Sequence, residues 1–257
     1  MHGIPAQRWR LVVRRAAGAG GLAQRDATAA WEEAIRSTGL PLVTVDDEGR
    51  RPRLAFGAPA GGMLASDGDL VDLWLTHRLP VAEVRAALLG NLPADHELVG
   101  LHDVWLGEGP LPARVVASDV EATITTTAPI GQLEAAAAAI LARRSLPRQR
   151  TRAGRTIAYD LRPLLLHLAV EPASSPTGAA DEGVVRMRVA HDPERGVGRP
   201  DEVLAALAEE AGQSIVTRSL VRRRLLLVED LGPPTAGPAA IAGGSSTAAR
   251  PRSVGGQ

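Results

Sequence analysis

A run of arginines between residues 143 and 155 has the side chains best suited to binding an anion. It comprises Arg143, Arg144, Arg148, Arg150, Arg152 and Arg155, and no acidic residue interrupts residues 135 to 158. On a hairpin strand, the two-residue period places Arg148, Arg150 and Arg152 on one face. Arginine binds phosphates through paired N–H groups and by displacing counterions from a polyanion. The run, with Arg222 to Arg224 as a second basic stretch, predicts an anionic partner, RNA in particular. The alternative is a solvated arginine face.

Carboxylates offer a second kind of chemistry. Asp67 and Asp69 flank an expected turn after the glycines Gly61 and Gly62, and Asp72 follows. Paired carboxylates can divide acid and base roles, but no nucleophile lies nearby in the sequence. The acidic run at residues 46 to 48 precedes a glycine and is more typical of a solvated loop than of a cation site.

The sequence contains little that indicates a metal site, a reactive cysteine or a nucleotide-binding loop. None of the histidines has the HxH, HxxxH or HExxH spacing of a metal site, and we predict no metal. Cysteine is absent, which excludes a disulfide or a Cys-ligated iron–sulfur cluster within this chain. The glycines at residues 18 to 21 follow an expected strand, but the spacing GAGG indicates a flexible turn rather than a phosphate-binding loop.

The amino-acid composition further limits the kinds of chemistry and ligand contact that this chain can use. The chain has 257 residues, 45% of them hydrophobic and only 2% aromatic, so its core is aliphatic and stacking of bases on aromatic rings is disfavoured. Positive and negative side chains balance at 29 each, and every basic residue is arginine, which excludes lysine chemistry. Neither a signal peptide nor a membrane span is expected, and the expected compartment is the cytoplasm.

Hydrophobic periodicity predicts the order β-α-β-β-α-β twice. The first half has expected helices at residues 26–38 and 80–92. Its expected strands are 9–15, 41–45, 53–56, 70–76 and 97–106, of which 53–56 is an extra hairpin strand. The second half has expected helices at 130–144 and 200–212. Its expected strands are 114–127, 164–171, 184–190 and 214–228, with a hairpin at 148–161.

These elements predict an α+β fold of two ferredoxin-like units side by side, each an antiparallel sheet with helices packed on one face. The expected boundaries are 7–110 for the first unit and 111–230 for the second. Residues 231–257 are rich in Gly, Pro, Ala and Ser, which predicts a disordered tail.

Several stretches, in order, resemble the radical SAM-linked protein family, a bacterial domain of unknown function. It is encoded beside, or fused to, radical SAM proteins of the cobalamin-binding type. The resemblance extends from Trp9 to about Val228. It rests on GLAQRDATAAWEEAIRSTGLPLV, RPRLAFGAPAGGMLASDGDLVDLWL, YDLRPLL, GVGRPDEVLAAL and the later Arg218.

The chain departs from that family at two places. Ala23 and Gln24 stand where the family has a Ser-His pair, and residues 47–51 replace a Gly-Phe-Asn/Thr-Pro-His run, of which only Pro52 survives. These losses favour a divergent or non-catalytic member. The family positions that remain are Asp26, Arg53, Asp69, Asp160, Arg162 and Arg199.

We therefore expect a non-catalytic or weakly catalytic accessory protein that works with a radical SAM enzyme and binds or presents an anionic, RNA-like substrate. The resemblance implies that this partner carries the iron–sulfur cluster and S-adenosylmethionine, and that this chain binds no cofactor. The expected anion-binding residues are Arg53, Arg148, Arg150, Arg152, Arg162, Arg199 and Arg218. One alternative is an RNA-modifying enzyme, similar in outline to some tRNA pseudouridine synthases, with Asp26, Asp69 or Asp160 as acid or base. The other is an interaction module without a ligand.

Overall fold

The computed structural model describes residues 3–16, 24–46, 48–58, 64–127, 129–152, 155–173 and 182–230. The side chains at positions 24, 25, 151, 152 and 155 are not described. The tail from residue 231, Gly61 with Gly62, and the expected hairpin turn at residues 153 and 154 also lie outside the described residues.

The first half of the chain forms an antiparallel sheet covered by two helices. Its elements are β1 (Gln7–Arg15), α1 (Gln24–Ser37), β2 (Leu54–Phe56), β3 (Ala65–Leu75), α2 (Val81–Leu88) and β4 (His96–Val104). β1 pairs with β4 on one side and β3 on the other, and β2 pairs with β3. Alternation along β1 turns Leu11 and Val13 toward Trp31 and Ile35 of α1, and these side chains share one apolar core.

The second half is built around a second apolar core. Its elements are α3 (Leu111–Arg114), β5 (Val115–Thr126), α4 (Ile130–Ala142), β6 (Pro147–Arg152), β7 (Arg155–Asp160), β8 (Leu165–Pro172), β9 (Glu182–Asp192), β10 (Gly196–Val197), α5 (Pro200–Ala211) and β11 (Ile215–Leu227), with 3-10 turns at Arg162–Leu164 and Val228–Asp230. β9 lies between β5 and β8, and β11 pairs with the other side of β5. α4 and α5 bury Leu133, Ile140 and Leu207 against this sheet. β6 and β7 form a separate hairpin.

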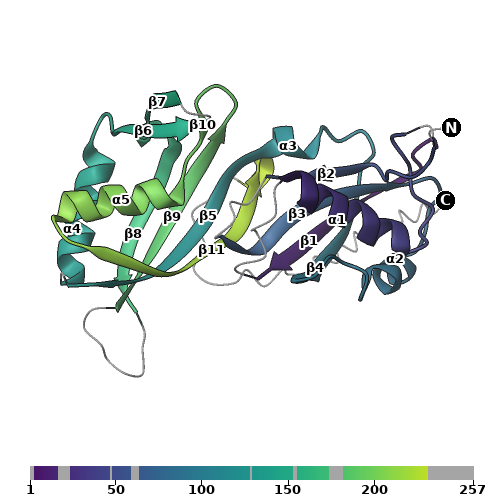
Figure 1. Cartoon of the computed structure of the whole chain (residues 1–257), viewed down its shortest axis with the longest axis horizontal. Helices are drawn as coiled ribbons and strands as arrows, with labels where there is room; N and C mark the ends of the chain where they lie inside the picture. Colours follow the sequence, from purple (N-terminus) through teal and green to yellow (C-terminus); the bar gives the residue numbers. More distant parts are fainter. Residues whose placement is uncertain are drawn as a thin grey trace, which may run out of the picture.

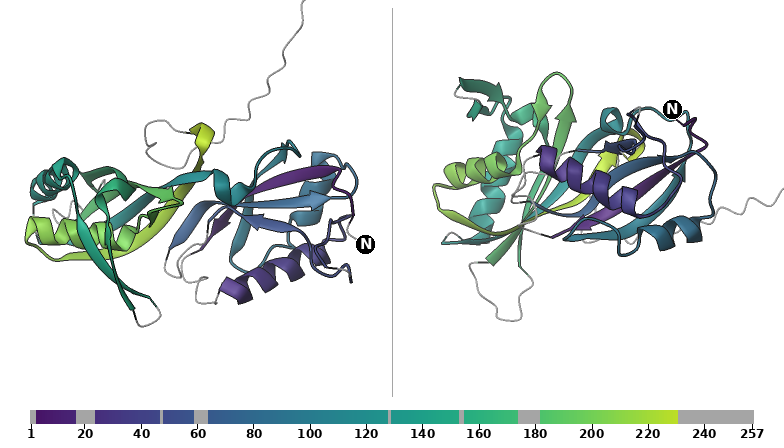
Figure 2. Two further views of the ribbon diagram at one scale, coloured as in Figure 1. Left: turned by 90° about the horizontal axis from the view of Figure 1, so that it is seen from above. Right: turned by 45° about the vertical axis from the view of Figure 1, so that its right-hand side comes forward.

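The two halves are joined in a single sheet. β11 pairs in parallel with β3 through Val221 opposite Ala65 and Arg222 opposite Ser66. Because of this pairing, nine strands in the described part of the chain form a single, mostly antiparallel sheet. The sequence predicts two separate sheets instead. Figures 1 and 2 show the halves end to end, with β5 and β11 reaching toward β3. We call this junction the seam.

A ladder of alternating charges also crosses the seam. Its members, one per strand from β8 to β4, are Glu171, Arg186, Glu121, Arg223, Asp67, Arg14 and Glu97. At the seam, Arg223 contacts Glu121 at 2.6 Å and Asp67 at 2.5 Å. The Arg223 side chain is 28% exposed, so this link is screened only in part and helps to fix how the halves meet.

Two local expectations are wrong. Residues 41–45 form only isolated bridges, Leu42 with Leu75 and Thr44 with Pro52, and β2 is the strand that pairs with β3. Asp67 and Asp69, expected beside a turn, lie inside β3. The turn is absent there because β11 supplies Arg222 and Arg223, which neutralise both carboxylates within the sheet.

Candidate anion-binding pocket

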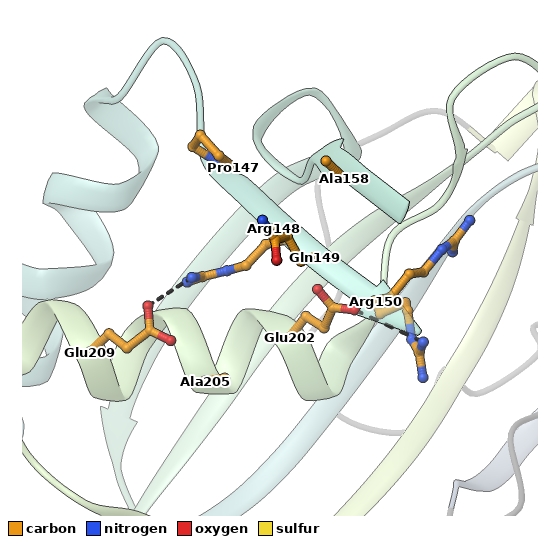
Figure 3. A pocket seen from close by; sticks show the side chains of 9 residues that line it. Pro147, Arg148, Gln149, Arg150, Ala158, Glu202, Ala205 and Glu209 are labelled. Atoms are coloured by element: carbon orange, nitrogen blue, oxygen red, sulfur yellow. Dashed lines mark hydrogen bonds and ion pairs between the residues drawn. The ribbon is translucent and has the colours of Figure 1, made fainter. Parts of the chain in front are cut away.

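An arginine-lined pocket lies where the β6–β7 hairpin leans over α5 (Figure 3). Its volume is about 650 Å³. The lining residues are Pro147, Arg148, Gln149, Arg150, Ala158, Arg199, Glu202, Ala205 and Glu209. Three of the arginines that the sequence singles out as anion-binding therefore meet in one place.

Local sequence explains how these side chains converge. Arg148 and Arg150 are two residues apart on β6, so they share the strand face predicted for them. Arg199 is the N-cap of α5, with Pro200 as the first helical residue, and Gly212 ends the helix in the left-handed region at φ 63°. Because the helix begins at this point, Arg199 and Glu202 stand at the same end of the pocket.

The pocket carries more positive than negative charge. Arg148 contacts Glu209 at 2.7 Å, and Arg199 lies 3.3 Å from Asp201 and 3.9 Å from Glu202. Figure 3 shows Arg148 reaching Glu209 across the pocket. Arg150 has no carboxylate within ion-pair distance among the described residues, and its guanidinium lies 5.3 Å from the centre of the Tyr159 ring. The buried Nε atoms of Arg148 and Arg150 also lack a hydrogen-bond partner in that part of the chain.

Tyr159, the only tyrosine, stands behind the pocket as a neutral group. Its hydroxyl donates a hydrogen bond to Glu202. Burial, followed by this hydrogen bond and the charge of Glu202, raises the pKa of Tyr159. Tyr159 therefore stays protonated and holds Glu202 in place, so that carboxylate is not free to approach Arg150.

The other expected anion-binding residues lie elsewhere. Arg53 stacks on Trp74 of the first half, 4.3 Å from the ring centre. Arg162 donates to the backbone oxygens of Leu141 and Leu165, which gives it a structural role in the second half. Arg218 is exposed on β11, and the side chain of Arg152 lies outside the described residues.

The three candidate carboxylates lie in separate surroundings. Asp26 is exposed in the first turn of α1, and Asp69 contacts Arg222 at the seam. Burial acts to raise the pKa of Asp160, but backbone N–H groups of Leu146 and Arg162 donate to it and lower the pKa overall. Asp160 is therefore an ionised cap at the base of the hairpin. No described hydrogen bond links any two of these three carboxylates.

One close polar pair has no local sequence signal. The Ser118 hydroxyl on β5 lies 2.7 Å from Nε2 of His191 on β9. The two residues are 73 positions apart, so only the pairing of β5 with β9 brings them together.

Clusters of metal-ligating side chains and helices able to span a membrane are both absent from the described residues. No three His, Asp or Glu side chains there gather closely enough to hold a metal ion. Of the helices described, none combines the length and apolar character needed to cross a bilayer.

Fold and site define a mixed α/β protein with a large, mostly antiparallel sheet and an arginine-lined pocket. The chain belongs to the family described as "Uncharacterized protein conserved in bacteria (DUF2344)", whose profile matches residues 8–200. No curated protein matches the chain.

Solved structures offer distant similarities of fold. A Cbf5-Nop10-Gar1 complex matches with TM-score 0.44 and 8% identity over 82% of this chain and 48% of that chain. An archaeal box H/ACA sRNP Nop10-Cbf5 complex matches with TM-score 0.39 and 9% identity over 84% and 48%. An unknown protein from Galdieria sulphuraria has TM-score 0.22 and 15% identity over 83% and 98%. This chain thus spans about half of the first two, and none of these similarities carries an argument about function.

Proposed function

We propose that this chain is an accessory protein that binds an anionic, RNA-like substrate in the pocket of Arg148, Arg150 and Arg199. The observation that carries the proposal is Arg150, which faces the pocket without a carboxylate partner among the described residues. A guanidinium with an unpaired buried Nε gains from an anion that supplies both charge and hydrogen-bond acceptors.

The existing ion pairs of the pocket would exchange easily for phosphate. The Glu209 and Asp201 side chains, which contact Arg148 and Arg199, are 64% and 61% exposed. Exposed pairs of this kind contribute roughly 0–1 kcal/mol, so a phosphate that replaces them loses little. A polyanion also releases counterions on binding, which favours RNA over a single small anion.

Substitution of Arg150 tests this function. We expect Arg150→Gln to weaken binding of a single-stranded RNA 12-mer about fivefold, because one charge-assisted contact of roughly 1 kcal/mol is lost. Filter binding of the full chain at fixed salt measures the effect. Arg195→Gln is the matched control, since Arg195 is exposed and pairs with Asp192 in a turn. Unchanged affinity in Arg150→Gln, or equal loss in the control, would remove the pocket from the proposal.

The accessory role rests on the resemblance to the radical SAM-linked family. A partner enzyme would carry the iron–sulfur cluster and S-adenosylmethionine, since this chain has no cysteine. The proposal also includes two ferredoxin-like units. The strand orders β4-β1-β3-β2 and β11-β5-β9-β8 support this part of it. The proposed location is the cytoplasm.

Co-expression with a radical SAM protein from the same genome tests the partnership. We expect the two chains to co-purify through size exclusion at micromolar concentration. Arg150→Gln should leave this complex intact, because in our proposal the pocket contacts the substrate and not the partner enzyme. Separate elution of the two chains would contradict the accessory role while leaving RNA binding untouched.

A further inference from the structure

The arginine-lined pocket has a second wall that carries carboxylates. Three side chains of α5 line it, Glu202, Ala205 and Glu209, because residues three or four apart share one face of a helix. Figure 3 shows Glu202 and Glu209 rising from α5 toward β6, with Ala205 between them. The small side chain of Ala205 leaves space between the two carboxylates. The hairpin wall therefore offers hydrogen-bond donors, and the helix wall offers acceptors.

Glu202 is held in place through one of its two carboxylate oxygens. Oε2 accepts the hydrogen bond from the neutral Tyr159 hydroxyl. Oε1 lies 3.9 Å from Nη1 of Arg199, which is too long for a hydrogen bond. The side chain is only 15% exposed, so a hydrogen bond to Oε1 would form in a place largely shielded from water, where it is stronger. Oε1 can therefore accept a hydrogen bond from a donor that enters the pocket.

A bound phosphate affects the two carboxylates of this wall differently. Glu209 is 64% exposed, so it can turn into solvent when a phosphate takes its place on Arg148. Glu202 cannot turn away in this manner, because Tyr159 holds it and the surrounding chain covers it. Phosphate oxygens only accept hydrogen bonds, so they do not satisfy Oε1, and their charge repels it. A ligand that fits this pocket well therefore carries a hydrogen-bond donor close to its phosphate.

We infer that Glu202 makes the pocket selective for ribonucleotides, by accepting a hydrogen bond from a ribose 2′-hydroxyl at Oε1. This inference rests on the proposed function and narrows its ligand to RNA as opposed to DNA. The 2′-hydroxyl is a donor that RNA carries on each sugar of the chain and DNA lacks. The volume of about 650 Å³ falls within the range of roughly 300–1,000 Å³ for ligand pockets, so a nucleotide unit has room to enter. The arginines then hold phosphates while Glu202 contacts the sugar.

Filter binding of the full chain to two single-stranded 12-mers, one of uridines and one of deoxyuridines, tests this selectivity at one salt concentration. The two share the same base, which has no amino group, so they differ only in their 2′-hydroxyls. We expect the wild-type chain to prefer the uridine 12-mer about tenfold, from one hydrogen bond to a charged acceptor. Glu202→Leu should reduce this preference to less than about twofold. It should also bind the deoxyuridine 12-mer at least as tightly as the wild type, because a negative charge leaves the pocket.

A neighbouring carboxylate of α5 provides the matched control. Glu210 is 23% exposed, close to the value for Glu202, but it pairs with Arg143 and does not line the pocket. Glu210→Leu should therefore keep the tenfold preference for the uridine 12-mer. If Glu202→Leu does not fold, Glu202→Gln takes its place, since an amide can still accept the hydrogen bond from Tyr159. Its contact with a hydroxyl is neutral, so the preference should fall to about threefold.

Equal affinity of the wild-type chain for the two 12-mers would overturn this role of Glu202. So would a preference that stays at its wild-type value in Glu202→Leu, or in Glu202→Gln where that variant replaces it. A preference for RNA that appears only with cytidine or adenosine would assign Glu202 to a base amino group instead, and would also overturn it. If both 12-mers bind equally and Arg150→Gln weakens both, the ribose contact fails while the proposed function stands. If Arg150→Gln weakens neither, the proposed function itself fails.

Discussion

Replacement of Asp72 with alanine is expected to destabilise the protein by about 3–5 kcal/mol, the largest stability effect that we predict. Asp72 is fully buried on β3. It accepts hydrogen bonds from Nε of Arg8 at 2.9 Å and from Nε of Arg10 at 2.8 Å, together with one further N–H group of each. Both arginines are themselves buried, so removal of the carboxylate leaves two buried cations that face each other.

The surrounding charges cannot replace Asp72. Glu108 contacts Arg10 at 2.8 Å but is shared with Arg114. Burial alone would lower the pKa of Arg10; the hydrogen bonds and charges of Asp72 and Glu108 outweigh it and raise the pKa. Arg10 therefore remains charged in the folded protein, and it cannot escape the loss of Asp72 by releasing a proton.

Chemical denaturation measures the effect, with Glu97→Ala as the control. Glu97 is 66% exposed and pairs with Arg14 at the surface, so its loss should cost less than about 1 kcal/mol. The triple change Arg8→Met, Arg10→Met and Asp72→Leu should be less destabilising than Asp72→Ala, because it removes the charges together. A destabilisation by Asp72→Ala as small as that of the control would show that these arginines are solvated, contrary to the structure.

The second large effect concerns binding. The triple variant Arg148→Gln, Arg150→Gln and Arg199→Gln is expected to lose about 100-fold in affinity for single-stranded RNA, from roughly 1 kcal/mol per charge-assisted contact. Its Tm should change little, because Glu209 and Asp201, the nearest carboxylates to Arg148 and Arg199, are exposed. Glu202, 3.9 Å from Arg199, keeps its hydrogen bond from Tyr159. The control is Arg36→Gln, Arg50→Gln and Arg78→Gln, three exposed and paired arginines of the first half. Equal loss in both variants would indicate nonspecific attraction to arginine.

Local sequence patterns predict helices and strands well where the hydrophobic pattern extends over many residues. The alternation of β1 and the Pro-start and Gly-end of α5 give ranges within two residues of those observed. α2 ends at Leu88 rather than residue 92, because Gly90 adopts φ 79° and interrupts the apolar face. The same local rules place Arg148 and Arg150 on one face of β6.

Long-range pairing accounts for what sequence patterns miss. The parallel contact of β11 with β3 joins residues more than 150 positions apart, and it turns the expected acidic turn at Asp69 into part of a strand. The Ser118–His191 pair depends in the same way on β5 and β9. Residue types alone do not distinguish Arg162, which donates hydrogen bonds to backbone carbonyls, from Arg150, which lines a pocket.

The central claim is that Arg148, Arg150 and Arg199 contact phosphates of an RNA-like ligand. The most direct test is the slope of log binding constant against log salt concentration, for the wild-type chain and the pocket triple variant. Each phosphate contact to a single strand contributes about −0.7 to this slope, so the variant should have a slope shallower by about 2. Equal slopes for the two proteins would contradict phosphate contacts in this pocket, even if their affinities for RNA differed.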